Sequence, residues 1–260
     1  KIYKTLQKRF LGFQFSKHRR STIKMAFLSD TAICLRCWDF SETSQTVSLL
    51  TKEHGMIRGL AKGSKRDNGA FSGGFDPLTR GNIVARLKTN SDLATLTEWN
   101  LEHVWWSTRN NLDVNRGAIY MVDLVGRMLT DQDPHTNVYD TLLEALNRID
   151  DGHDIDWPLL RFQWALLVET GYKPTLETVC ENELVVAFSS KTGGVVEDTG
   201  EFDRVRVRKE TVEVLRLLKE DKPMQPIEPK ALDRANRLLA HYLRDIIGKE
   251  SAAMRWMWNN

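Results

Sequence analysis

Hydrophobic and polar residues alternate along the first third of the chain, which is the period of a β-strand with one buried face. The run TAICLRCW at residues 31–38 places Ile33, Leu35 and Cys37 on one face and the intervening residues on the other. Similar short segments follow at residues 46–51, 56–62, 82–88 and 93–98, with a long glycine-rich loop between the third and the fourth strand. Five short strands with such a loop are typical of a small closed barrel, of which the oligonucleotide-binding (OB) fold is one.

From residue 106 onward the hydrophobic residues recur every three or four positions, which predicts amphipathic helices. Such stripes run over residues 118–129, 138–149, 159–166, 212–218 and 229–248, and Pro158 suits the first turn of the third. Between the third and fourth helices, the alternating runs VVAF and GGVV predict a short two-stranded insertion. The large apolar residues of the terminal segment SAAMRWMWNN are expected to pack back on the body of the protein.

These periods predict an α+β multidomain protein. A five-stranded OB-fold barrel at residues 25–105 precedes an all-helical domain at residues 106–171 and 206–260, and residues 172–205 form a small insertion within that domain.

Residues 1–24 form a basic leader with eight Lys or Arg residues and no Asp or Glu, although the whole chain carries only +2. A disordered nucleic-acid-binding arm, a targeting peptide and an over-extended start before Met25 all explain such a segment. The leader lacks the apolar core of a secretory signal. Because three cysteines are too few for a disulfide framework and no apolar run could span a membrane, we expect a cytoplasmic protein.

Basic residues concentrate at positions 58–66 of the barrel segment and in the hairpin that follows. Cations that follow the phosphates, together with aromatic rings on which bases stack, form the usual binding surface for single-stranded nucleic acid. The residues expected on this surface are Arg36, Trp38, Arg58, Lys62, Lys65, Arg66, Phe71, Arg80, Arg86 and Lys88. A solvated loop above buried rings is the alternative, and Trp38 suits burial as well as stacking. The basic run RVRVRK at residues 204–209 likewise suits either a solvated edge strand or an anion-binding face.

Motifs for catalysis are missing from the sequence. It contains no G-x-S-x-G, no G-x-x-x-x-G-K-[ST] and no G-x-G-x-x-G, so neither a nucleophile elbow nor a nucleotide cofactor is indicated. Cys34 and Cys37 have C-x-x-C spacing, but an offset of three in a strand points two side chains to opposite faces. We therefore expect a buried structural pair, and a protein that is not an enzyme.

Several ordered segments resemble a known family. The segment TKEHGMIRGLAKGSKR, the glycine-rich loop with FDPL and the run LATLTEWNLE resemble the amino-terminal barrel of the bacterial recombination mediator RecO family. The segments FQWALLVETGYKPTLETVC and RLLAHYLRDIIGKESAAMRWM resemble its helical region, so that the resemblance covers residues 25–258.

The resemblance implies a non-enzymatic DNA repair protein of homologous recombination, in the RecFOR pathway and associated with the nucleoid. It implies binding of single- and double-stranded DNA, annealing of complementary strands, and loading of RecA with the help of RecR on DNA coated by the single-stranded-DNA-binding protein. An OB-fold RNA-binding protein is the alternative, and competition between DNA and RNA of one sequence would separate the two. An enzyme with an unfamiliar site would instead show a deep cleft with converging acid, base and donor groups.

Many members of the family carry four cysteines in two C-x-x-C pairs within the insertion. Here only Cys180 remains, while Glu183 stands at the second position and Glu197 and Gly200 fall near the other two. One thiolate with one or two carboxylates cannot make the sulfur-rich tetrahedron of a structural zinc site. We therefore predict a degenerate, zinc-less insertion and no other cofactor. Elemental analysis of the purified protein should find no zinc, and one tightly bound zinc per chain would contradict this prediction.

Overall fold

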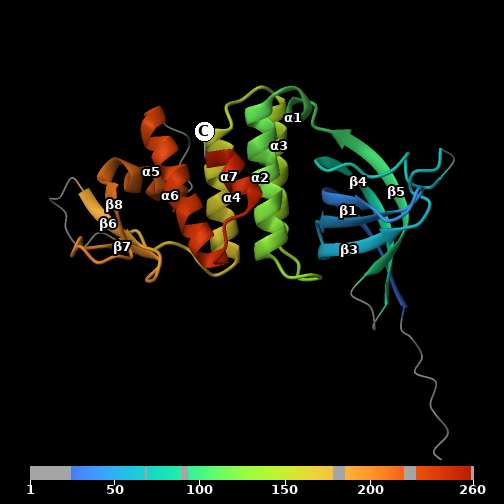
Figure 1. Ribbon diagram of the computed structural model, residues 1–260, viewed down its shortest axis with the longest axis horizontal. Coiled ribbons are helices and arrows are strands. Elements are labelled where there is room, and N and C mark those ends of the chain that lie inside the picture. Colours follow the sequence, from blue (N-terminus) through green and yellow to red (C-terminus); the bar gives the residue numbers. More distant parts are fainter. Residues whose placement is uncertain (1–24, 68, 89–92, 178–184, 220–226, 259–260) are drawn as a thin grey trace, which may run out of the picture.

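The computed structural model describes residues 25–67, 69–88, 93–177, 185–219 and 227–258. The basic leader, Cys180 and Glu183 lie outside the described residues. Three parts follow one another along the long axis of the molecule: a barrel, a group of helices and a small sheet (Figure 1). Among the described residues, no helix combines the length and the apolar composition that a membrane crossing needs.

The first part is a closed barrel of five strands, which confirms the predicted fold. The strands are β1 (Met25–Asp39), β2 (Gln45–Thr51), β3 (Gly55–Ala61), β4 (Thr79–Lys88) and β5 (Ala94–Val104). Their order around the barrel is β1-β2-β3-β5-β4, and antiparallel pairing of β1 with β4 closes it. The alternating residues of the strands, among them Val47, Ile57 and Ile83, fill the interior.

A β-bulge in β1 changes which residues face the interior. The pairing of β1 with β2 shifts register between Cys34 and Arg36. Bulged strands place two successive residues on one side. Leu35 packs in the core shared with the helices and Arg36 points to helix α2 (Leu112–Met128), whereas Cys37 packs against the barrel core that contains Cys34. The strict alternation expected for residues 31–38 is therefore wrong beyond Leu35.

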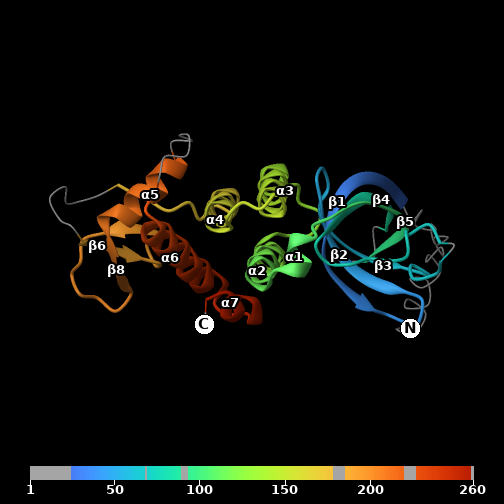
Figure 2. The ribbon, with the colours of Figure 1, turned by 90° about the horizontal axis from the view of Figure 1, so that it is seen from above.

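The second part contains the predicted helices. After the short α1 (Ser107–Asn110), helix α2 lies beside α3 (Thr136–Asp150) and α4 (Asp156–Glu169), and α6 (Pro229–Ile247) packs between α4 and α5 (Lys209–Lys219) (Figures 1 and 2). The terminal α7 (Ala252–Trp258) packs on α2, where the edge of the Trp258 ring meets Tyr120. Met254, Met257 and Trp258 thus pack back on the body as predicted, whereas Trp256 stays 60% exposed.

The third part is a small sheet at the end opposite the barrel. Strand β6 (Val185–Ser189) pairs with β7 (Gly194–Val196), which confirms the predicted pairing of VVAF with GGVV. A further strand, β8 (Arg204–Arg208), pairs with the other edge of β6. The insertion is thus a three-stranded sheet instead of the predicted two-stranded one, and the basic run RVRVR is an edge strand of it.

The barrel and the helices share one hydrophobic core. Ile33, Leu50 and Met56 of the barrel belong to the same apolar cluster as the helices, and Trp105 donates to Asn147 of α3. Contact extends to the backbone, because a side chain at Gly55 would overlap the backbone of Asp133 in the α2–α3 loop. The two parts are therefore packed as directly as elements of a single domain.

One buried carboxylate holds this interface from both sides. The side chain of Asp123 on α2 is only 5% exposed. It accepts a hydrogen bond from Arg36 of the barrel and another, at 2.8 Å, from Arg127 one helical turn further on. A buried charge requires such partners, because an unpaired ion in the interior costs several kcal/mol.

Replacing this carboxylate should destabilise the whole chain. We expect Asp123→Ala to lower the free energy of unfolding by about 2–3 kcal/mol, less than for a fully buried pair because both guanidinium groups keep some solvent access. The matched control is Asp140→Ala, which removes a half-exposed interface pair with Lys52 and should cost less than about 1 kcal/mol. Denaturant unfolding measures both values, and equal losses would contradict the role of burial.

Candidate nucleic-acid interface

Two loops meet at the end of the barrel that lies away from the helices (Figures 1 and 2). The β3–β4 loop runs beside the β1–β2 hairpin, with Lys65 N donating to Thr43 O at 3.1 Å and Gly63 N to Ser44 Oγ at 3.1 Å. The hairpin contributes two aromatic rings and the loop contributes three cations. We call this the loop surface, and its residues are Trp38, Phe40, Lys62, Lys65 and Arg66.

The buried side chain of Gln45 ties the two loops together. Its Nε2 donates to Phe75 O at 3.1 Å, and its Oε1 accepts from Phe75 N and from Ser64 Oγ, both at 3.0 Å. Both polar atoms of the amide are therefore bonded in a place that water does not reach, which strongly favours one loop conformation. These hydrogen bonds of Gln45 therefore fix the backbone position of the loop that carries Lys62, Lys65 and Arg66.

The cations of the loop surface differ in their surroundings. Lys62 and Arg66 are exposed and have no ion-pair partner among the residues that the structure describes. The Arg66 side chain lies beside Gly63, whose φ of +69° favours glycine there. Lys65 Nζ lies 2.6 Å from Asp39 Oδ1. Exposed ion pairs contribute only about 0–1 kcal/mol, so a phosphate group can displace this carboxylate.

The exposure of the aromatic rings differs from the prediction. Trp38 is 53% exposed and Phe40 is 64% exposed, so both offer a face to solvent. Phe71 is only 6% exposed and packs against Phe75, which in turn lies 4.8 Å from the ring of Trp99. The prediction that Phe71 stacks on bases is therefore wrong: its ring anchors the loop in the barrel core. Phe40 was missed, although an isolated phenylalanine in the polar turn DFSETS is a usable signal.

Three predicted arginines lie next to the helices instead of on the loop surface. Arg36 is held by Asp123 in the domain interface, so its assignment to a phosphate-binding surface is wrong. Arg58 pairs at 3.3 Å with Asp131 of the α2–α3 loop. Arg80 pairs at 3.5 Å with Glu102 and lies near Tyr139 of α3, where burial raises the pKa of the tyrosine to about 12.

Arg86 forms a separate contact on β1 and β4. Its guanidinium group lies over the ring of Phe27, 5.1 Å from the centroid, and Phe27 is exposed. The two residues are direct partners in the pairing of β1 with β4. The side chain of Lys88, two pairs further along, lies outside the described part of the chain. The ten predicted residues therefore do not form one surface.

The bulge in β1 also brings the two barrel cysteines together. Cys34 and Cys37 pack in the same core, contrary to the expectation that their side chains point to opposite faces. A hydrogen bond between the two thiols is the main cause that lowers the pKa of Cys37, and it raises the pKa of the fully buried Cys34. Cys37 is therefore the better nucleophile of the two.

Alkylation should distinguish these two thiols. Because the lowered pKa of Cys37 gives it more thiolate at a given pH, its reaction with iodoacetamide should reach half its maximal rate below pH 9, with Cys34 protected until the chain unfolds. Peptide mapping by mass spectrometry separates the sites. Cys34→Ala removes the hydrogen-bond donor, so the pH at which Cys37 reacts at half its maximal rate should rise. Cys34→Ser keeps a donor, so this pH should change less. An unchanged profile in Cys34→Ala would contradict the hydrogen bond.

The insertion offers little to a metal at the described positions of the family pattern. The backbone oxygen of Glu197 accepts a hydrogen bond from Arg204, and Gly200 has no side chain. Nowhere in the described ranges do three or more His, Cys, Asp or Glu side chains form a group that could hold a metal ion. The two remaining positions, Cys180 and Glu183, lie outside those ranges.

Two family models match this chain. The model of the recombination protein O amino terminus covers residues 25–105, and that of the recombination protein O carboxyl terminus covers residues 109–253. The chain belongs to the RecO family.

Relatives of the RecO family bear the name DNA repair protein RecO. A protein of this name from Rhodopirellula baltica is 35% identical over 172 residues, which is 64% of each chain. Another from Bacillus subtilis is 31% identical over 55% of this chain and 56% of its own. One from Anaeromyxobacter sp. strain K is 25% identical over 87% of this chain and 94% of its own. The chain thus matches less than two thirds of the first two relatives.

Proposed function

We propose that this chain acts in DNA repair by homologous recombination, as a non-enzymatic protein that binds single-stranded DNA at the loop surface. The observation that carries the proposal is the joint exposure of Lys62, Lys65 and Arg66 beside two exposed aromatic rings on an OB-fold barrel. The names of the RecO relatives support the repair role.

The chemistry of the loop surface suits pairing of strands without any covalent step. Cations that neutralise phosphates release counterions and lower the repulsion between two strands. Exposed rings accept bases face to face, and each stacked base contributes about 1–3 kcal/mol. Neither contact reads the edges of bases, so binding is largely independent of sequence. Association with RecR, with the single-stranded-DNA-binding protein and indirectly with RecA belongs to this proposal through the family alone.

Reversal of the three loop cations tests the proposal. We expect the combined variant Lys62→Glu, Lys65→Glu and Arg66→Glu to weaken binding of an oligothymidylate more than tenfold at low salt. Loss of three phosphate contacts should also reduce the slope of log affinity against log salt by about 2, at roughly 0.7 per contact. Fluorescence anisotropy in a salt series measures both, and a strand-annealing assay should show the same loss.

The matched control reverses three cations of the helical part. The combined variant Lys230→Glu, Lys249→Glu and Arg255→Glu makes the same change in net charge and should keep nearly the parental affinity and slope. Equal effects of the two variants would show that total charge, and not the loop surface, determines binding. An unchanged affinity in the loop variant would refute the proposed surface.

The exposed ring of Trp38 and the buried ring of Phe71 give a second test. Trp38→Ala should lower DNA affinity about tenfold, the loss of one stacked base, and leave stability nearly unchanged because the ring is exposed. Phe71→Ala should instead lower the free energy of unfolding by about 3–4 kcal/mol, because it empties part of the barrel core. Binding titrations and denaturant unfolding on both variants are needed. If Trp38→Ala binds like the parent, the hairpin takes no part in stacking.

A further inference from the structure

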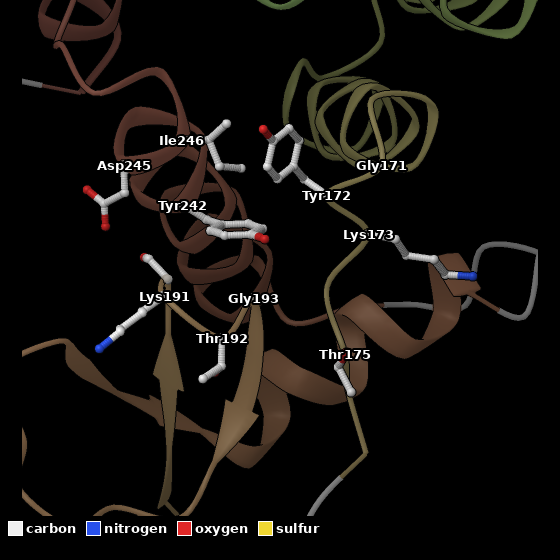
Figure 3. Close-up of a pocket in the computed structure, with 11 residues that line it drawn as sticks. Gly171, Tyr172, Lys173, Thr175, Lys191, Thr192, Gly193, Tyr242, Asp245 and Ile246 are labelled. Carbon is white, nitrogen blue, oxygen red and sulfur yellow. The ribbon is translucent and has the colours of Figure 1, made fainter.

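A cavity of about 500 Å³ lies between the helices and the small sheet, remote from the loop surface. It is bordered by the segment between α4 and β6, by the β6–β7 hairpin and by the second half of α6 (Figure 3). Its volume is in the range of small-ligand sites. The proposed function of the loop surface does not use it.

Backbone contacts hold the walls of this cavity in place. Thr175 N donates to Gly193 O at 2.9 Å, and Val195 N donates back to Thr175 O at 2.8 Å. Gly193 has a φ of +71°, and a side chain there would meet the hydroxyl of Tyr242 at 2.7 Å. Glycine at this position therefore allows the tyrosine to reach the hairpin. The cavity is formed before any ligand binds.

Two tyrosines give the cavity an aromatic character. Tyr242 is buried, and its ring packs nearly perpendicular to that of Phe188 at a centroid distance of 5.3 Å. Tyr172 is 46% exposed, and both tyrosine rings border the opening with Ile246 beside them (Figure 3). Since a half-exposed ring next to a preformed cavity offers one free face, a flat aromatic ligand can stack there.

The charge around the cavity favours an anionic ligand. Lys173 and Lys191 lie on opposite sides of the tyrosines, with their amino groups directed outward from the rings (Figure 3), and neither has an ion-pair partner within the described residues. The one carboxylate in the lining, Asp245, is already paired with His241 at 3.2 Å and Arg244 at 3.4 Å. In addition, the buried hydroxyl of Ser190 has no hydrogen-bond partner in the described structure.

We propose that this cavity takes one nucleobase of a single-stranded polynucleotide, stacked on Tyr172, with the flanking phosphates at Lys173 and Lys191. Aromatic stacking between two cations is the arrangement by which single strands are bound without sequence preference. The inference rests on the proposed function and deepens it. The barrel with its loop surface and the α6 and β6–β7 elements that line the cavity belong to different parts of the molecule (Figure 1), so that one chain has two separate contacts for nucleic acid.

Variants of the full-length chain test the cavity separately from the loop surface. The probe is an oligothymidylate of ten nucleotides with a photoreactive 5-iodouracil in the middle. In the chain with Lys62→Glu, Lys65→Glu and Arg66→Glu, we expect the remaining affinity to fall about tenfold with Tyr172→Ala and to persist with Tyr172→Phe, which keeps the ring. Lys173→Glu with Lys191→Glu should reduce the salt slope by about 1.4.

Photocrosslinking locates the contact directly. In the unaltered chain, mass spectrometry should find crosslinked uracil at Tyr172 or its neighbours, and Gly193→Ala, which displaces Tyr242, should reduce that crosslink at least threefold. No crosslink at the cavity, together with unchanged affinity in Tyr172→Ala, would overturn the inference while the loop surface stands. Loss of binding only in the cavity variants would support the cavity and refute the loop surface instead.

Discussion

The packing of the barrel on the helices depends on a buried carboxylate that is paired with one arginine from each part. Asp123 of α2 lies in an apolar interface, and it is tolerated there because Arg36 of the barrel and Arg127 of its own helix both bond to it. Around it the apolar residues of both parts form one continuous core.

The same interface decides which cations remain accessible to a partner. Arg36 and Arg58 are directed at carboxylates of the helical part, and Arg80 is paired beside α3. The cations on the far end of the barrel escape this pairing because no helix packs there. The loop surface therefore keeps cations that the domain interface does not pair, and the hydrogen bonds of Gln45 hold its loops together.

The loop surface and the cavity both combine aromatic rings with cations, but they are built from different elements. At the barrel end, the cations stand on the β3–β4 loop and the rings of Trp38 and Phe40 lie where β1 turns toward β2. Between α6 and the three-stranded sheet, two tyrosines and two lysines border a preformed cavity. The pairing of β6 with β7 and β8 supplies backbone hydrogen bonds across the described part of the insertion.

The periods of the sequence determined the order and type of the strands and helices, because burial of one face is a local property that the chain records at every second or every third to fourth residue. They could not determine the bulge in β1, which a shift in pairing creates and which sends Arg36 to the helices and Cys37 to the interior. Nor could they separate Trp38 from Phe71. A ring in a polar loop has the same sequence signature whether it is exposed or anchors that loop in a core, and only the packing of β5 and its Trp99 against the loop decided the matter.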